Sequence, residues 1–344
     1  MPAASVASTG IKSSRSAPAR VLMTASSSAP CGNTARKSPA SASGKSLGKQ
    51  ALRGAKLMQG KRALITGATD GIGKQAALEI ASMGAAVTLV GRNEAKTRAV
   101  CGELQKQTGN PDINWLLGDL SSMDAVRRIA GEFRERHDRL DVLLNNAGAS
   151  FSSYYESVDG IEMTIALNHF SYYLLTNLLL DMLVDTAAAS GEARIVNVSS
   201  SAHKSAGSDG MHFDALNDPS QFKPFPAYGR SKLANLLFTY ELDLRLAGTG
   251  VSVNAVNPGL VNTSIGDNMS GWIRHFFKLM KIVMGQTPKK GAETLVYLAT
   301  APEVAGISGK YWAFLQQHDS SDISYDREQQ RKLWQYSAAA SGVG

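Results

Sequence analysis

The stretch KRALITGATDGIG, residues 61–73, decides the fold. Its first seven residues form a short apolar run that predicts a strand, and the run leads directly into a glycine-rich turn. The glycine spacing is TGxxxGxG. Gly67 allows a tight turn after the strand, and Gly71 and Gly73 let the backbone approach a pyrophosphate at the N-terminus of the next helix. The stretch therefore predicts the first strand–helix unit of a nucleotide-binding sheet.

Strand-length apolar runs and amphipathic helical patterns then alternate along the chain. Most runs are continuously apolar, which is typical of strands buried on both faces of a parallel sheet. We therefore expect one α/β domain over residues 58–340, a Rossmann-type doubly wound parallel sheet of about seven strands with helices on both faces. The later strands are expected at 85–91, 113–119, 141–148, 194–200, 251–258 and 309–314, and helices near 72–83, 123–137, 162–184, 228–247 and 288–300.

The net charge of +7 belongs to the start of the chain. Residues 1–60 contain nine Lys or Arg and no acid, which leaves 27 bases against 29 acids in the remainder, a net charge of −2. A nearly neutral domain argues against a nucleic-acid partner.

Residues 1–57 are rich in Ser and Ala, with scattered basic residues and no apolar run of secretory length. This composition predicts an organellar transit peptide, and the Ser-rich stretch TASSSAPCG (24–32) favours the chloroplast over the mitochondrion. An ordinary disordered tail is the alternative. The sequence contains no run of about twenty apolar residues, so we expect no membrane-spanning helix. The two cysteines, Cys31 and Cys101, form neither a disulfide framework nor a metal site, and we expect no metal.

The end of the second strand bears on the choice of cofactor. An NAD site usually places an acid there for the ribose 2′-hydroxyl, whereas this chain has Gly91 and Arg92, with Lys96 one turn later. A guanidinium suits a 2′-phosphate, so NADP(H) is favoured over NAD(H). Asp70, inside the glycine loop, argues against this because its charge disfavours a phosphate. The alternative for Arg92 is a simple surface arginine.

Two further strand ends carry polar or small residues. Asp119, in GDL, is placed to accept from an adenine amino group or to cap the helix that begins near Ser122. NNAG (145–148) provides amides and small residues at a carboxyl end, where ligands of open α/β sheets bind.

YGRSK (228–232) places a tyrosine and a lysine at i and i+4, which are neighbours on a helix surface. By itself this pair occurs often by chance. The order of the motifs changes that reading, because TGATDGIG, GDL, NNAG, NVSSSA, YGRSK and NPGLVNT resemble together the short-chain dehydrogenase/reductase superfamily over nearly all of residues 60–320. ALNHFSYYLLTNLLL, IVNVSSSAH, YGRSKLANLLFTYEL and TPKKGAET are similar to its retinol dehydrogenase-like branch.

The resemblance implies a catalytic set. Tyr228 would be the general acid or base, and Lys232 would lower its pKa and hold the nicotinamide ribose. Ser200, the second of three serines, would hydrogen-bond the substrate oxygen, and Asn168 would hold a water linked to Lys232. Besides Tyr228 and Lys232, the implied cofactor-binding residues are Gly67, Asp70, Gly71, Ile72, Gly73, Arg92, Asp119, Leu120, Asn146, Ala147, Gly148, Pro258, Gly259, Val261 and Thr263.

The family's substrate loop corresponds here to residues 264–287. Within it, 271–285 mixes large apolar and basic residues, which fits a lid over an apolar pocket or a helix lying on an anionic membrane. The segment 325–336 predicts an amphipathic helix with Leu333 and Trp334 inward and is a candidate homodimer contact. His203 and His212 are interpreted as loop residues.

The resemblance thus predicts an NADP(H)-dependent enzyme that interconverts an apolar alcohol and its carbonyl, with retinoid-, isoprenoid- or fatty-aldehyde-like substrates. One alternative is a non-catalytic NADP(H)-binding redox sensor or scaffold in an organelle, which would not need all four catalytic residues. A second alternative is a protochlorophyllide reductase-like enzyme. NNAG and the lack of that group's cysteine pattern argue against it.

Overall fold

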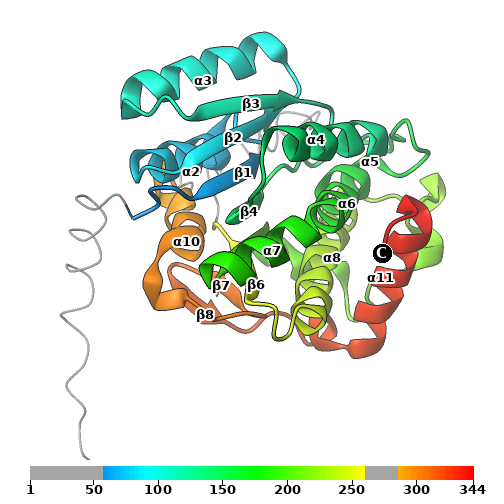
Figure 1. Cartoon of the computed structure of the whole chain (residues 1–344). Coiled ribbons are helices and arrows are strands. Elements are labelled where there is room, and N and C mark those ends of the chain that lie inside the picture. Colours follow the sequence, from blue (N-terminus) through cyan, green and yellow to red (C-terminus); the bar gives the residue numbers. More distant parts are fainter. Residues whose placement is uncertain (1–56, 260–285) are drawn as a thin grey trace, which may run out of the picture. The chain divides into compact units, whose positions relative to one another are not determined.

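An eight-stranded sheet runs through the part of the chain that the computed structural model describes, residues 57–259 and 286–344 (Figure 1). The strand order is β3-β2-β1-β4-β5-β6-β7-β8, and every neighbouring pair is parallel except β7 and β8. This confirms the predicted doubly wound sheet and adds a short antiparallel edge strand. The strands are β1 (Arg62–Thr66), β2 (Ala86–Gly91), β3 (Ile113–Leu117), β4 (Val142–Asn145), β5 (Ala193–Val198), β6 (Val251–Asn257), β7 (Tyr311–Ala313) and β8 (Gln316–His318).

The direction of strand order reverses between β1 and β4. The chain adds β2 and β3 on one side of β1 and then returns to place β4 on the other side, with Leu64 paired to Leu143. In sheets of this kind, ligands bind at the carboxyl ends of the strands where the strand order reverses. The fold alone places the candidate site at this edge.

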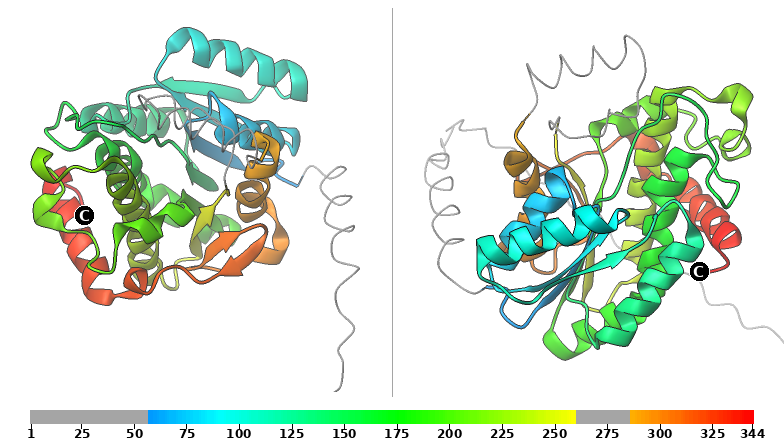
Figure 2. Two further views of the ribbon diagram at one scale, coloured as in Figure 1. Left: turned by 180° about the vertical axis from the view of Figure 1, so that it is seen from behind. Right: turned by 90° about the horizontal axis from the view of Figure 1, so that it is seen from above.

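Helices cover both faces of the sheet (Figure 2). One apolar core lies between the sheet and α2, α3 and α10, and a second lies between the sheet and α4, α6, α7, α8 and α11. The helices are α2 (Gly71–Ser82), α3 (Glu94–Thr108), α4 (Met123–Arg136), α5 (Met163–Ile165), α6 (Ser171–Leu178), α7 (Leu180–Ser190), α8 (Pro224–Arg245), α10 (Pro288–Thr300) and α11 (Arg327–Ser341).

Helix α3 was not predicted from the sequence. Only four of its fifteen residues are buried, so its apolar stripe is narrow: Thr97, Val100, Cys101 and Leu104. The helix is nevertheless well delimited, because Asn93 caps its N-terminus and Gly109 ends it in a left-handed conformation.

The helix predicted over 162–184 is divided into shorter pieces. A π-helical turn, η1 (Ala166–Phe170), lies between α5 and α6, and Leu179 separates α6 from α7. Such turns are frequent at functional sites, and this one contains Asn168.

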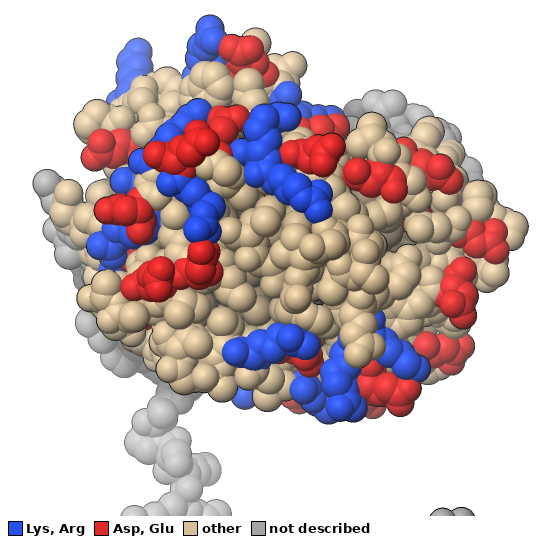
Figure 3. All heavy atoms as spheres, turned by 45° about the vertical axis from the view of Figure 1, so that its right-hand side comes forward, with Lys and Arg blue, Asp and Glu red and all other residues tan. Residues whose placement is uncertain are grey.

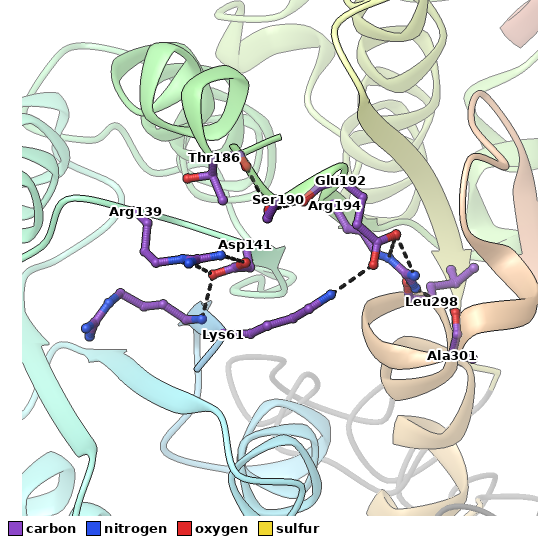
Figure 4. Close-up of polar contacts among 10 residues, drawn as sticks. Lys61, Arg139, Asp141, Thr186, Ser190, Glu192, Arg194, Leu298 and Ala301 are labelled. Carbon is purple, nitrogen blue, oxygen red and sulfur yellow. Dashed lines mark hydrogen bonds and ion pairs between the residues drawn. The ribbon is translucent and has the colours of Figure 1, made fainter. Parts of the chain in front are cut away.

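A polar cluster holds the opposite, amino-terminal edge of the sheet together (Figure 4). Asp141 accepts from Arg139, and Arg194 donates to two carbonyl groups at the end of α10, at 3.1 and 2.8 Å. Glu192 pairs with both Arg194 and Lys61, the latter at 2.9 Å. These contacts connect β1, β4, β5 and α10 away from the candidate site.

The C-terminal helix packs inward as predicted. Leu333 and Trp334 of α11 are buried in the core beside α8, and the Arg245 guanidinium lies 3.9 Å from the Trp334 ring centre. On the face seen in Figure 3, basic and acidic side chains are interspersed. No helix among the described residues is long and apolar enough to cross a membrane.

Several predictions fall on residues that the structure does not describe. The transit peptide lies outside the described residues except for its last residue, and so does the substrate segment 264–287 except for its last two. The membrane-contact segment 271–285 and the cofactor residues Val261 and Thr263 also lie outside.

Candidate active site

The glycine loop after β1 closes tightly on the end of β4. Gly67 and Gly71 have positive φ values of 64° and 52°. A Cβ on Gly73 would lie 2.4 Å from both the Gly67 carbonyl oxygen and Asn146 Nδ2. No side chain fits at Gly73, so the spacing of these glycines follows from packing as well as from the turn.

Thr66 and Asn146 hold that closure, and the sequence analysis overlooked Thr66. The Thr66 hydroxyl accepts from the backbone amides of Asn146 (2.9 Å) and Ala147 (3.0 Å). Asn146 Nδ2 donates in return to the carbonyls of Thr66 (2.9 Å) and Gly67 (3.2 Å). The Asn146 side chain therefore supports the glycine loop. The sequence signal for Thr66, the partner of Asn146, is only that a threonine ends the strand directly before the glycine turn.

The N-terminus of α2 offers backbone donors beside a neutralised acid. Asp70 caps the helix, with its Oδ1 accepting from the Gly71 amide at 2.7 Å. Its other oxygen pairs with Lys96 at 2.9 Å, and no acid lies in the first turn of α2. Both partners of the pair are about half-exposed, so the contact is screened by solvent. Lys96 balances the negative charge of Asp70, so this charge disfavours a phosphate less than the sequence alone indicates.

Position 91 excludes any side chain. A Cβ there would lie 2.2 Å from Thr97 Oγ1 and 2.7 Å from Thr69 Cγ2. The next residue, Arg92, is exposed, and no ion pair joins it to an acid in residues 57–259 or 286–344. Among the described residues, the end of β2 therefore presents a guanidinium without an ion pair and no carboxylate of its own.

Asp119 does not cap α4. Its Oδ1 accepts from the amide (3.0 Å) and hydroxyl (2.8 Å) of Ser121, which forms a local turn, and Ser122 caps the helix. The alternative that Asp119 is the cap is therefore wrong. Leu120 and Ile72 point their side chains into the cores, so any cofactor contact from them uses the backbone.

Tyr228 and Lys232 lie on one side of α8, which begins at Pro224, four residues earlier than predicted. Lys232 Nζ is 5.6 Å from the centre of the Tyr228 ring. The Ser200 side chain lies close enough to Tyr228 to lower the pKa of its phenol. The structure thus brings together these three residues, which the sequence separates by up to 32 positions.

The three neighbouring serines have different environments. Ser199 Oγ donates to the Lys232 carbonyl at 2.8 Å and is buried. Ser200 Oγ accepts from the Ala202 amide at 3.2 Å, at the start of the 3₁₀ helix η2 (Ser201–Ala206). Ser201 is exposed. Of the three serines, Ser200 is the one whose side chain acts on the pKa of Tyr228.

Asn168 clamps the backbone that follows NNAG. Its Oδ1 accepts from the Ala149 amide at 2.8 Å, and its Nδ2 donates to the Ala149 carbonyl and to Ser231 Oγ, both at 2.9 Å. The side-chain amide is used by protein contacts, so its expected role in holding a water stays a prediction.

Burial dominates the electrostatics of the tyrosine–lysine pair. It raises the pKa of Tyr228 to about 12 against the opposing effect of Ser200, and it lowers the pKa of Lys232 to about 7. We expected Lys232 to lower the pKa of Tyr228. In the chain alone the pKa of Tyr228 moves the other way, because the loss of water around the buried phenol is the largest effect on it.

A nicotinamide dinucleotide fits these residues. Lys232 is 3% exposed and has three N–H donors, one of which Nζ gives to the Val198 carbonyl oxygen at 3.1 Å. A Cβ on Gly148 would approach Asn168 Oδ1 to 3.1 Å and Lys232 Nζ to 3.4 Å, so glycine keeps the space beside the ammonium open. Ribose hydroxyls would satisfy the remaining donors.

The motif after β6 is described only at its start. Gly259 has φ +79° and donates its amide to Asn257 Oδ1 at 3.0 Å. A positive φ of this size favours glycine. Pro258 precedes it at the same edge of the sheet as the glycine loop.

Comparison with known proteins agrees with this geometry. The family model described as short chain dehydrogenase matches residues 61–215 and 217–273. Human retinol dehydrogenase 14 is 37% identical over 302 residues (83% of this chain, 88% of that protein), and human polyprenol dehydrogenase is 36% identical (82% and 85%). Short-chain dehydrogenase TIC 32 B, chloroplastic, of Brassica napus is 38% identical (80% and 87%).

Solved structures are similar as well. A protein from Mycobacterium Paratuberculosis matches with a TM-score of 0.66 and 29% identity, covering 83% of this chain and 95% of that one. The Pseudomonas aeruginosa RhlG/NADP active-site complex matches with a TM-score of 0.59 and 28% identity, covering 74% and 94%. The chain is therefore an oxidoreductase-family protein, a retinol dehydrogenase-like member of the short-chain dehydrogenases.

Proposed function

We propose that the chain is an NADP(H)-dependent enzyme that interconverts an apolar alcohol and its aldehyde or ketone. The observation that carries the proposal is the meeting of Ser200, Tyr228 and Lys232 at the carboxyl edge of the sheet, beside a glycine loop whose one acid is balanced. Arg92, which has no ion pair within the described part of the chain, supports a 2′-phosphate. A similar solved structure is an NADP complex, which supports binding of NADP by this chain.

In carbonyl reduction, bound NADPH supplies a hydride to the carbonyl carbon. Tyr228 donates its phenolic proton to the carbonyl oxygen, and Ser200 hydrogen-bonds that oxygen while negative charge develops on it. With a pKa of about 12, the phenol is protonated at neutral pH and ready to act as an acid. The reverse reaction needs the phenolate. A nearby positive charge from Lys232 and the oxidised cofactor would favour that form.

The substrate class rests on the relatives. The names retinol dehydrogenase and polyprenol dehydrogenase describe enzymes of isoprenoid alcohols, so we infer a long apolar substrate for this chain. NADPH oxidation by the full chain, measured with retinal, polyprenal, fatty and aromatic aldehydes and with NADH in parallel, tests this. We expect turnover on an apolar aldehyde and its loss by orders of magnitude in Tyr228→Phe with NADPH binding retained. NADPH binding without turnover on any carbonyl would favour the redox-sensor alternative instead.

We also infer a chloroplast location, from the composition of residues 1–57 and the chloroplastic relative. Fusing residues 1–57 to a fluorescent protein and incubating the fusion with isolated chloroplasts and mitochondria tests it. Import into mitochondria alone would contradict the inference. Contact of residues 271–285 with an anionic membrane is a further proposal. Flotation with anionic liposomes should weaken in Lys278→Ala/Lys281→Ala, and unchanged flotation would exclude that contact.

A further inference from the structure

A buried imidazole connects the backbone of Ser200 to the C-terminal part of the chain. His203 lies in η2, and 1% of its surface is exposed. Its Nδ1 is 2.6 Å from the Ser200 carbonyl oxygen, and its Nε2 is 3.0 Å from the backbone nitrogen of Ser321, 118 residues later. The edge of its ring packs against Tyr311 of β7, with ring centres 5.4 Å apart. The sequence analysis placed this residue in a loop, which is wrong.

The two partners determine the protonation of the ring. The Ser321 amide can only donate, so Nε2 carries a lone pair. The Ser200 carbonyl can only accept, so Nδ1 carries the proton. His203 is therefore a neutral imidazole with its hydrogen on Nδ1. Burial lowers its pKa, with Lys204 acting in the same direction, which agrees with the neutral ring.

Ser321 is itself held against the helix that carries Tyr228. Its neighbour Ser320 bonds the Tyr240 hydroxyl at 2.7 Å, and the Ser320 amide donates to the Tyr325 hydroxyl at 3.1 Å. Tyr240 lies on α8, twelve residues after Tyr228, and its ring stacks on Tyr325 with centres 5.1 Å apart. The amide that His203 accepts from is thus fixed relative to α8.

We propose that His203 is a positioning residue that holds Ser200 in register with Tyr228, a role that rests on the function proposed above. The Ser200 side chain has one other described restraint from the protein backbone, the 3.2 Å bond from Ala202. The Nδ1–H bond fixes the peptide that carries Ser200, and the Nε2 bond fixes the imidazole to the frame of α8. Without the imidazole, Ser200 is free to move relative to the phenol, and a small displacement of a catalytic group is costly in rate.

Ser321→Pro tests the hydrogen bond from the Ser321 amide to His203 Nε2 with little other change. Ser321 has φ −67°, which proline prefers, and its carbonyl contacts to Ser324 do not need its N–H. Proline removes the donor to Nε2, and its Cδ takes the place of the hydrogen, so the imidazole must turn away. Ser321→Ala is the matched control because it keeps the N–H and removes a buried hydroxyl that bonds to none of the residues described.

Two changes at His203 provide an independent test. His203→Phe keeps the volume of the ring and removes both hydrogen bonds. His203→Asn keeps a donor close to the position of Nδ1 and loses the bond to Ser321. We expect His203→Asn to retain more activity than His203→Phe, which a purely space-filling role of the ring would not produce.

The measurements are ¹⁵N NMR of histidine-labelled full chain, melting temperature, NADPH affinity, and kcat and KM on an apolar aldehyde. We expect an Nδ1–H tautomer for His203, and in Ser321→Pro a kcat about tenfold or more lower with NADPH affinity unchanged. Ser321→Ala should match the unaltered chain. An Nε2–H tautomer, or unchanged kcat in folded Ser321→Pro and His203→Phe, would overturn the role of His203 alone. Absence of turnover in the unaltered chain would overturn the proposed function, and the catalytic role of His203 with it.

Discussion

Arg92→Asp should reverse the preference between NADPH and NADH without unfolding the chain. Arg92 is exposed and has no described ion pair, and it precedes the Asn93 cap of α3 without taking part in it. A surface change of this kind alters the free energy of unfolding by less than about 0.5 kcal/mol. The loss of hydrogen bonds from a guanidinium to a phosphate costs about 1.5–3 kcal/mol, so NADPH should bind roughly 10- to 150-fold more weakly. NADH has no 2′-phosphate and should be spared that loss.

The assay is fluorescence titration of both nucleotides at one fixed ionic strength, because salt screens such contacts. Gly91→Asp is the structural control. It places an acid one residue earlier, where a Cβ meets Thr97 Oγ1 at 2.2 Å, so it should destabilise the fold by about 1–3 kcal/mol and lower its melting temperature. Arg92→Asp should not.

Two results would refute the reasoning about Arg92. Equal weakening of NADPH and NADH would mean that the change disturbs the whole nucleotide site. An unchanged affinity ratio would mean that Arg92 is the surface arginine of the alternative interpretation and that the phosphate binds elsewhere.

Three further predictions concern stability. Burial holds the pKa of His169 at about 3, below its unfolded value of about 6.5, so its contribution to the free energy of unfolding is complete above pH 6.5 and falls by up to about 1.4 kcal/mol per pH unit below it. Urea unfolding at pH 7 and pH 5 should show a smaller pH dependence of stability in His169→Asn than in the unaltered chain. An identical pH dependence would exclude His169 as its source. Arg194→Met leaves the carbonyls of Leu298 and Ala301 without this donor, while Glu192 keeps Lys61, and should cost about 1–3 kcal/mol in chemical denaturation, whereas an unchanged free energy of unfolding would mean that this cluster contributes little. Leu315→Gly should stabilise the β7–β8 turn by up to about 1 kcal/mol, because Leu315 has φ +64°; a lower melting temperature would count against strain there.

The sheet could be predicted because buried parallel strands have a local signature. The seven predicted apolar runs cover the strands β1 to β7, except for the first residue of β5, Ala193. The eighth strand, Gln316–His318, is polar and exposed on every residue, so neither periodicity nor apolarity indicates it. It pairs with β7 through a turn in which Phe314 and Leu315 both have positive φ. Glycine usually indicates such a conformation, and this turn contains none.

The site was predictable wherever its geometry is local or topological. Tyr228 and Lys232 face each other because they are one helical turn apart, and the glycine loop and NNAG meet because parallel strands end at one edge. Thr66 and His203 were missed, because their roles depend on partners at the end of β4 and in the segment after β8.

By itself the sequence determined the alternation of strands and helices, the nucleotide-binding end of the sheet, and the residues able to transfer a proton. Each of these follows from patterns within a few consecutive turns or strands. Only the tertiary structure decided that Lys96 balances Asp70, that position 91 admits no side chain, and that His203 joins Ser200 to Ser321. These contacts join residues up to 118 positions apart, and packing of the whole domain sets their distances, which local periodicity does not encode.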